Sequence, residues 1–375
     1  MMLASRTPAG WVTLARLDLP SRPPRRTILR GRGITFDTGL FPARDVPSTH
    51  EPFDPELVAR EMRVIHDDLH CNVVRATGSD LSRLEIAARS AGDAGLKVWY
   101  SPFTVDIGTD EMLDYLDDAA ERCERLRRDG VDVTLTLGAE MSVWNHGFLP
   151  GETFRDRIPD LNPLNLQYVE LLQQAPALLD AFFAQAVPRV RERFGGPISY
   201  ASLPFEQIDW SPFDYASVDL YPNVVDGRYV GALETVRRIA AHDKPVAITE
   251  FGCPASRGAG RRAGRVQDVV VWDWPSQIAS ELREELVRDE AEQRGYITGL
   301  LDLFEAEQVD TAFVFTFASR NMPQRAEPRR DADLASYSLV RVLESGRGDA
   351  YEDMPWEPKE AFHAVAQRYA GAQRS

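Results

Sequence analysis

Short apolar runs alternate with longer amphipathic segments along most of the 375-residue chain. Each apolar run has the length of one buried strand, and each amphipathic segment has room for a helix before the next run. The runs predicted to be strands are Gly33–Phe36, Asn72–Ala76, Leu96–Ser101, Val133–Gly138, Ile198–Ser202, Tyr215–Tyr221, Pro245–Thr249 and Thr311–Phe317. This alternation is typical of a parallel sheet with helices packed outside it.

The segments between these runs carry helix signals. Asp54, Pro55 and Glu56 supply an N-cap, a proline at the first helical position and an acidic first turn. Apolar residues recur at helical spacing from Met112 to Leu126, and the pattern stops at a glycine. Further helices are predicted over roughly 80–94, 167–194 and 229–241, over a long region that follows a loop at 253–275 and ends near 307, and over Pro358–Tyr369.

Eight strands in strand–helix order predict an α/β fold of the (β/α)8 (TIM) barrel type. A doubly wound sheet is the alternative, but it usually begins with a glycine-rich phosphate loop after the first strand. In GRGITFDTGL the first glycines precede the strand, and no GxxxxGK[ST] motif occurs. We therefore expect a single barrel over 30–372 with insertions after strands four and seven. Residues 1–29, which end in SRPPRR, are expected to form an N-terminal arm with one strand at WVTLARL.

Two glutamates directly follow apolar strands, Glu140 in VTLTLGAE and Glu250 in KPVAITE. Residues at the carboxyl ends of barrel strands line the mouth, where active sites lie. Glu140 shares strand parity with Thr134 and Thr136, and the opposite face of that strand is apolar, so Glu140 is expected to turn inward. Parity does not decide the direction of Glu250. Taken singly, either residue could be a helix cap or a surface ion-pair partner.

Hydrolysis of a glycoside needs one carboxylic acid that protonates the leaving oxygen and one carboxylate that acts on the anomeric carbon. Two glutamates on strands four and seven of a barrel can supply this pair if burial raises the pKa of one and donors keep the other ionised. We therefore interpret Glu140 as the acid/base and Glu250 as the nucleophile.

The sequence resembles the retaining glycoside hydrolases of clan A over roughly residues 30–370. Ile248-Thr249-Glu250-Phe251-Gly252 is similar to that clan's nucleophile segment, and LKVWYSP at 96–102 to its third strand. The resemblance implies that Arg75 and Tyr221 lie beside the nucleophile. It further implies a carbohydrate-binding mouth; the residues expected to contact substrate there are Asp37, Arg75, Tyr100, Trp144, Tyr221 and Phe317.

Three features depart from the clan's pattern. Ala139 stands where the clan usually has asparagine before the acid/base, and strand eight ends in TFAS, which offers Phe317 instead of tryptophan. The segment DADLASYSLVRVL resembles bacterial proteins that carry the label "abortive infection protein". The first two departures keep open a second hypothesis, a glycan-binding barrel that is inactive or whose carboxylates serve another transfer reaction.

The composition of the chain argues against several classes of binding partner. The formal net charge of −15 argues against nucleic acid and anionic membranes, both of which attract clustered Lys and Arg. Three separated cysteines indicate neither a disulfide framework nor a zinc site, and the six scattered histidines suggest no metal centre. No run long enough for a membrane span and no secretory leader is evident, so we expect a cytoplasmic protein without a cofactor. The sequence leaves the sugar and the oligomeric state open.

Overall fold

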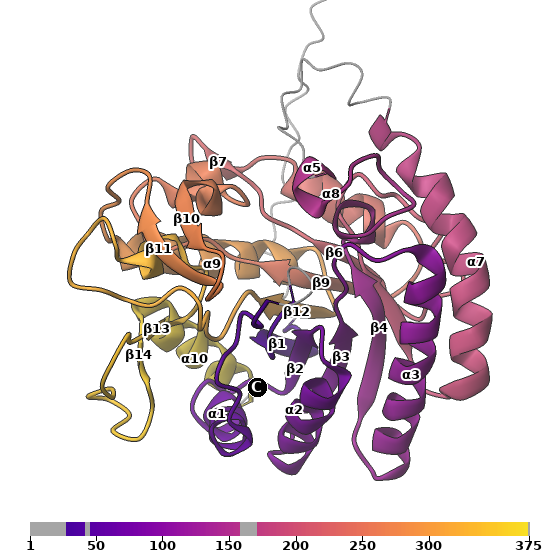
Figure 1. Ribbon diagram of the computed structural model, residues 1–375, viewed down its shortest axis with the longest axis horizontal. Coiled ribbons are helices and arrows are strands. Elements are labelled where there is room, and N and C mark those ends of the chain that lie inside the picture. The colour runs from indigo at the N-terminus through magenta and orange to yellow at the C-terminus, as the bar shows by residue number, and fades with distance from the viewer. Residues whose placement is uncertain (1–27, 42–45, 158–170, 374–375) are drawn as a thin grey trace, which may run out of the picture.

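Eight parallel strands form the centre of the molecule in the computed structural model, which describes residues 28–41, 46–157 and 171–373 (Figure 1). The strands are β1 (Gly31–Asp37), β2 (Val73–Gly78), β3 (Lys97–Pro102), β4 (Val133–Ala139), β5 (Ile198–Ala201), β6 (Ala216–Asp219), β9 (Val246–Phe251) and β12 (Thr311–Val314). They pair in the order β5-β4-β3-β2-β1-β12-β9-β6. A single parallel bridge between Ser202 and Val218 joins the two ends. The predicted (β/α)8 barrel is confirmed.

The seam between β5 and β6 is held largely by serine side chains. Backbone pairing at the seam is short, with the Asp219 amide donating to the Ser202 carbonyl at 2.9 Å. The Ser202 hydroxyl donates to the Ser217 carbonyl at 2.8 Å, and the Ser199 and Ser217 hydroxyls lie 2.5 Å apart. These contacts close the barrel where the regular ladder of backbone hydrogen bonds is missing.

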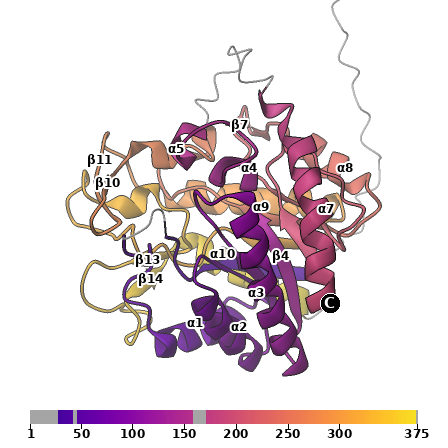
Figure 2. The same cartoon turned by 45° about the vertical axis from the view of Figure 1, so that its right-hand side comes forward.

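Helices cover the outside of the barrel strands (Figures 1 and 2). They are α1 (Pro55–Asp67), α2 (Leu81–Asp93), α3 (Thr109–Arg128), α7 (Ala175–Arg193), α8 (Ala232–Ala240), α9 (Glu290–Ala306) and α10 (Glu360–Gln373). Asp54 caps α1 by accepting from the Glu56 amide, as predicted. The buried residues of α3 include Met112, Leu116 and Cys123, so the predicted amphipathic face does pack inward. Figure 2 shows α3 and α7 side by side over β4.

The lower barrel interior is filled by apolar side chains. Val73, Trp99, Ala247 and Phe313 form a buried cluster, in which the Trp99 and Phe313 ring centroids are 5.2 Å apart. The four residues come from β2, β3, β9 and β12. They form a floor, and the polar residues at the carboxyl ends of the strands lie above it.

Long insertions follow β4 and β9, as predicted. The first contains α4 (Met141–Trp144) and α5 (Phe154–Arg157). Its anchor is Arg157, which is 1% exposed, forms an ion pair with Asp106 and donates to the Val143 carbonyl at 2.9 Å. A small hairpin, β7 (Val224–Val225) and β8 (Arg228–Tyr229), follows β6.

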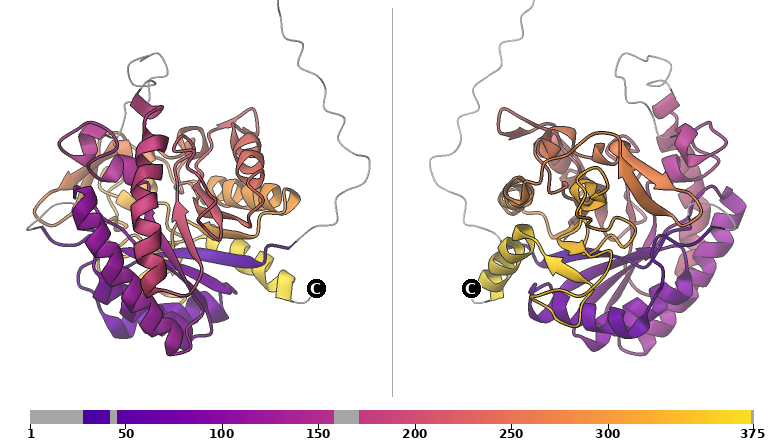
Figure 3. Two further views of the ribbon diagram at one scale, coloured as in Figure 1. Left: turned by 90° about the vertical axis from the view of Figure 1, so that its right-hand side faces the viewer. Right: turned by 60° about the vertical axis from the view of Figure 1, so that its left-hand side comes forward.

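The insertion after β9 contains a hairpin that the sequence did not predict. Two 3-10 turns, η1 (Ala259–Arg262) and η2 (Val266–Val269), lead into the antiparallel strands β10 (Val270–Asp273) and β11 (Ile278–Leu282). Figure 3 shows this orange hairpin projecting from the barrel. The expected long helical region is therefore wrong in its first part, and α9 begins at Glu290. The turn is fixed locally, because the Asp273 carboxylate accepts from the Ser276 hydroxyl at 2.5 Å.

A further insertion follows β12 and was also missed. It contains η3 (Ala332–Ala335) and the antiparallel pair β13 (Val340–Val342) and β14 (Trp356–Pro358). Its interior holds Lys359, fully buried, with Nζ 2.7 Å from an Asp333 oxygen.

In the part of the chain that the structure describes, no helix is long and apolar enough to cross a membrane. The strand expected at WVTLARL lies outside the described residues, and the domain limits of 1–29 and 30–372 stay predictions.

Candidate active site

A bulge in β9 directs Glu250 into the barrel mouth. Opposite β6, Val218 pairs with Ile248, but the next residue, Asp219, pairs with Glu250. Strand β9 thus has one residue more than β6 at this point, and its pairing with β12 shifts in the same place. An extra residue reverses the alternation of side chains beyond it. This explains why simple parity did not decide the direction of Glu250.

A second bulge, in β4, changes how Glu140 reaches the mouth. Thr136 pairs with Ser199 on β5 and Ala139 with Ala201, so β4 has an extra residue around Gly138, whose φ is 88°. Glu140 itself has left-handed backbone angles, φ 47° and ψ 37°. Its side chain points inward, as the parity argument predicted, but the bulge and this turn are the cause. Left-handed geometry in a residue other than glycine is uncommon and costs free energy, and it is frequent at functional sites.

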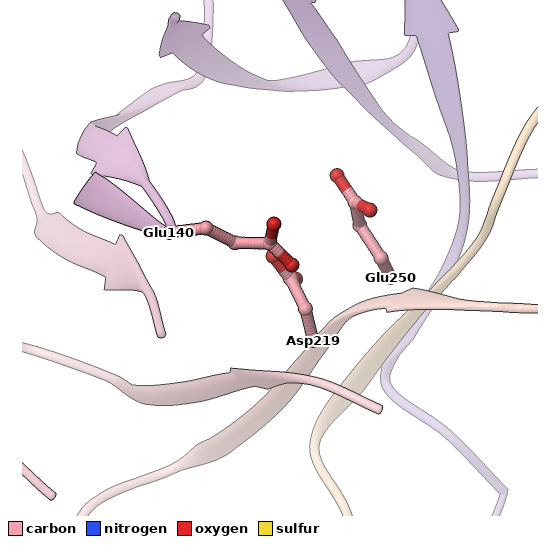
Figure 4. Close-up of side chains that lie close together, drawn as sticks. All are labelled: Glu140, Asp219 and Glu250. Carbon is pink, nitrogen blue, oxygen red and sulfur yellow. The ribbon is translucent and has the colours of Figure 1, made fainter. Parts of the chain in front are cut away.

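Three carboxyl groups converge in the mouth (Figure 4). Glu140 comes from the end of β4, Asp219 from β6 and Glu250 from β9. One oxygen from each side chain lies within 4.8 Å of one from each of the others. Three like charges at this spacing repel strongly, so the cluster has to hold a proton or attract a cation.

Arg75 and Tyr221 hold the Glu250 carboxylate from two sides. Arg75, which is fully buried on β2, donates from Nη1 to Glu250 Oε1 at 2.5 Å and from Nε to the Ser101 hydroxyl at 3.1 Å. The Tyr221 hydroxyl donates to Glu250 Oε2 at 2.7 Å. Burial raises the pKa of Tyr221, which keeps the hydroxyl a donor. A buried guanidinium and a phenol on opposite oxygens favour the ionised form of Glu250. Both residues therefore lie where the resemblance placed them.

Glu140 has the opposite electrostatic environment. Burial raises its pKa to about 8, and the nearby charge of Glu250 contributes in the same direction. Its hydrogen-bond donor is Trp144 on α4, whose Nε1 lies 2.9 Å from Glu140 Oε2. That bond favours the ionised form and only partly offsets the burial. The surroundings of Glu140 thus favour its protonated form, whereas Arg75 and Tyr221 are placed to stabilise a carboxylate on Glu250.

A column of stacked planar groups extends from Trp144 to the β10–β11 hairpin. The rings of Trp144 and Phe154 are stacked with centroids 4.8 Å apart. Arg155 lies over Phe154 on one side, and its Cζ is 3.6 Å from the ring centroid of Trp274. Trp274 remains 41% exposed. The insertions after β4 and β9 thus touch through a cation–π contact, and Trp144 lies at the mouth as predicted.

Two predicted substrate contacts are wrong. Tyr100 is fully buried among the helices, where its hydroxyl donates to the Leu81 carbonyl on α2. Its neighbours Trp99 and Ser101 face the barrel interior instead. Phe317 is also fully buried, between Phe36 and Trp356.

The aromatic residue of strand eight that faces the mouth is Phe315. Its ring contacts Tyr221 edge to face at 6.2 Å, and Tyr337 packs against both rings. Close packing here also explains Gly252, because a Cβ at that position would lie 2.5 Å from the Phe315 carbonyl oxygen. The pattern TAFVFTF offered three phenylalanines in alternation, and sequence alone did not show which faces inward.

Asp37 lies at the carboxyl end of β1, on the mouth side, as predicted. Its Oδ1 accepts from the Gly39 amide at 2.7 Å, and burial raises its pKa to about 6. Two further aromatics that follow barrel strands, Trp210 and Phe148, belong to the core and pack on Phe213 and Phe182.

Sequence reasoning did not single out two buried acids, Glu206 and Asp219, as members of this site. Glu206 follows β5 and lies behind Glu140; its carboxylate accepts from the Tyr200 and Ser142 hydroxyls at 2.9 and 2.6 Å. Asp219 is the last residue of β6. Both lie at or shortly after the carboxyl end of a barrel strand, the same region of the fold that holds Glu140 and Glu250.

The three carboxyls Glu140, Asp219 and Glu250 are the group among the described residues with the donor type and spacing to hold a hard divalent cation. Arg75 already supplies positive charge to Glu250 at hydrogen-bond distance. Such a cation would have to compete with this guanidinium, so the donor set fits a proton-sharing cluster better than a metal site.

Comparisons with known proteins give the fold its context. No family model and no curated protein sequence matches the chain. It is similar in structure to a GH113 β-1,4-mannanase, with 15% identity and a TM-score of 0.55 over 92% of this chain and 99% of the other. A β-glucosidase, 1317, matches with 12% identity and a TM-score of 0.51 over 91% and 98%.

A third similar structure is a GH2 β-galacturonidase from Eisenbergiella tayi, with 13% identity and a TM-score of 0.52. The match covers 92% of this chain, which spans 52% of the galacturonidase. None of these comparisons supports the label "abortive infection protein". At these identities they establish the architecture: the chain shares its (β/α)8-barrel fold with glycoside hydrolases.

Proposed function

We propose that this chain is a retaining glycoside hydrolase that cleaves a small or oligomeric glycoside by double displacement. The observation that carries the proposal is the pair Glu140 and Glu250 at the barrel mouth, one environment favouring the protonated form and the other the ionised form. Neighbouring carboxyls with opposed protonation states are the requirement for acid and nucleophile in glycoside hydrolysis.

In the first step, the Glu250 carboxylate attacks the anomeric carbon while Glu140 donates its proton to the leaving oxygen. The products are a glycosyl ester on Glu250, a free aglycone and an ionised Glu140. In the second step, Glu140 takes a proton from water as the water attacks the same carbon, and Glu250 leaves as a carboxylate. Arg75 and Tyr221 stabilise that carboxylate in the free enzyme and orient it for attack.

The spacing of the two glutamates favours retention over inversion. Retaining enzymes have their carboxyl groups about 5–5.5 Å apart, whereas inverting enzymes leave about 6.5–9.5 Å for a water molecule. Here an oxygen of Glu140 lies within 4.8 Å of an oxygen of Glu250. This close approach supports double displacement, in which no water has to lie between the nucleophile and the sugar in the first step.

Trapping of the glycosyl ester tests the proposal directly. Incubation with a panel of 2-deoxy-2-fluoroglycosyl fluorides is expected to add one glycosyl mass to the protein, on the peptide that contains Glu250. The fluorine slows both steps, and the activated leaving group lets the ester accumulate. Glu250→Gln is the matched control and should remain unlabelled. A folded protein that binds glycans in the mouth but takes up no label from any panel member would support the glycan-binding hypothesis instead.

A Trp144→Phe substitution should alter the pH dependence of the reaction. Phenylalanine keeps the stack with Phe154 but removes the hydrogen bond to Glu140. Because that bond favours ionised Glu140, its loss raises the pKa of Glu140, and the alkaline limb of kcat/KM should move to higher pH. We expect kcat to fall about 2- to 10-fold, the effect of one hydrogen bond.

The comparison for this test is Trp272→Phe, the same change in the β10 strand of the hairpin. That variant should retain the wild-type pH profile. An alkaline limb that moves to lower pH in Trp144→Phe, or does not move, would contradict the role of the indole as a donor to Glu140.

A further inference from the structure

Asp219 is a buried carboxyl with little hydrogen-bond support beside the two glutamates. It is 1% exposed and has no hydrogen bond of good geometry; the Thr249 hydroxyl is the donor beside it, and its effect on the carboxyl is smaller than those of burial and of Glu250. Buried carboxylates nearly always have donors, because an unpaired buried charge is costly. The nearby acid Glu206 differs from Asp219, because its carboxylate accepts four hydrogen bonds from Ser142, Tyr200 and Leu203. The burial of Asp219 is therefore compensated much less completely than that of Glu206.

The groups that face Asp219 explain how it can stay buried. Glu140 and Glu250 each bring an oxygen within 4.8 Å of it, from β4 and β9. Arg75 on β2 is the cation facing it, and the guanidinium is already engaged by Glu250. Thr249 on β9 is the remaining polar neighbour. Three carboxylates against one guanidinium leave two excess negative charges, and one bound proton reduces this excess to one.

We propose, on the basis of the function proposed above, that Asp219 is a positioning residue that shares one proton with Glu140 and so keeps the acid protonated at neutral pH. Ionisation of Glu140 would place a second charge next to Asp219 in a buried site. The two carboxyls therefore release their last proton as a pair. Burial and the charge of Glu250 raise the pKa of Asp219, as burial and Glu250 do for Glu140.

Over one catalytic cycle the pair Glu140 and Asp219 loses one proton and regains one. Glu140 transfers the shared proton to the leaving oxygen in the first step, and both carboxyls are then ionised. Their mutual repulsion makes Glu140 a stronger base at the moment when it must take a proton from water. The second step returns one proton to the pair. Asp219 itself forms no bond to the sugar in this scheme.

The test is a direct titration of Glu140 in protein labelled with 13C at the glutamate carboxyl carbon, with the Glu140 signal assigned by its loss in Glu140→Gln. Asp219→Asn removes one charge at nearly constant volume. It should lower the apparent pKa of Glu140 by about one unit or more. The alkaline limb of kcat/KM should move to lower pH by the same amount. Asp219→Glu retains the charge, so the apparent pKa of Glu140 and the alkaline limb of kcat/KM should both stay near their wild-type values.

Asp37→Asn is the matched control, the same change at the mouth on a strand outside the three-carboxyl cluster. It should leave the titration of Glu140 within about 0.3 units, whatever it does to substrate binding. If Asp219→Asn does not fold, Asp219→Ser removes the same charge from a smaller side chain and gives the same readout.

The possible outcomes separate this inference from the proposed function. A lowered Glu140 pKa in a protein that hydrolyses no glycoside supports the proton-sharing pair and refutes the hydrolase. Hydrolysis with an unmoved titration and unmoved alkaline limb in Asp219→Asn refutes the pair. A wild-type Glu140 titration that changes on addition of EDTA or Mg²⁺ would also overturn it, since a cation would then neutralise the cluster.

Discussion

Glu250→Gln is expected to abolish glycoside hydrolysis, with a loss of kcat on the order of 10⁴-fold or more. A neutral amide is a far weaker nucleophile than a carboxylate and cannot form the glycosyl ester. The barrel should still fold, because glutamine has the same shape. Its amide oxygen can accept from Arg75, and the Tyr221 hydroxyl can accept from its amide nitrogen.

The measurement is steady-state turnover of aryl glycosides together with the melting temperature. Glu307→Gln, at the end of α9 remote from the mouth, is the same chemical change and should retain full turnover. Residual activity within a factor of ten of wild type in a folded Glu250→Gln protein would remove Glu250 from the nucleophile role.

Glu140→Ala should have the second largest effect, and the effect should depend on the leaving group. Poorly activated substrates need a proton on the departing oxygen and should lose about 10²–10⁴-fold in kcat. Activated aryl glycosides, such as dinitrophenyl glycosides, leave without protonation and should lose far less in the first step. Their second step then becomes limiting, because no base deprotonates the water.

Azide should restore turnover of these activated substrates in Glu140→Ala. The anion needs no general base and fits the space left by the missing side chain beside Trp144. The product should be a glycosyl azide of retained configuration, identified by NMR. Equal losses on both substrate types, without rescue by azide, would mean that Glu140 has a structural role.

The eight barrel strands could be predicted from sequence because each is a short apolar run bounded by turns and followed by an amphipathic segment. The positions of Glu140 and Glu250 at the strand ends followed from that count. Their approach in space depended on bulges at Gly138 and Thr249, and a bulge leaves little trace in the alternation of residue types.

The two wrong placements, of Tyr100 and Phe317, have a common cause, because barrel strands are buried on both faces. Because β3 and β12 carry large apolar residues at successive positions, nothing in LKVWYSP or TAFVFTF tells the interior from the helix side. The resemblance implied Tyr100 and Phe317 at the mouth, and the strand pattern could not correct it; Ser101 and Phe315 are the residues directed there. Partners from distant segments, such as the contact of Arg155 with Trp274, depend on tertiary structure alone.

The seam between β5 and β6 has a consequence for how the barrel moves. A backbone ladder can be opened only by displacing a strand, whereas the Ser199, Ser202 and Ser217 hydroxyls release their partners by rotating about one side-chain bond. Amide protons along this seam should therefore exchange with solvent at a lower opening free energy than those of the other strand pairs. Asp219 and Glu206 flank the seam, so local opening there would admit water to the two buried acids while the other strand pairs of the barrel stay closed.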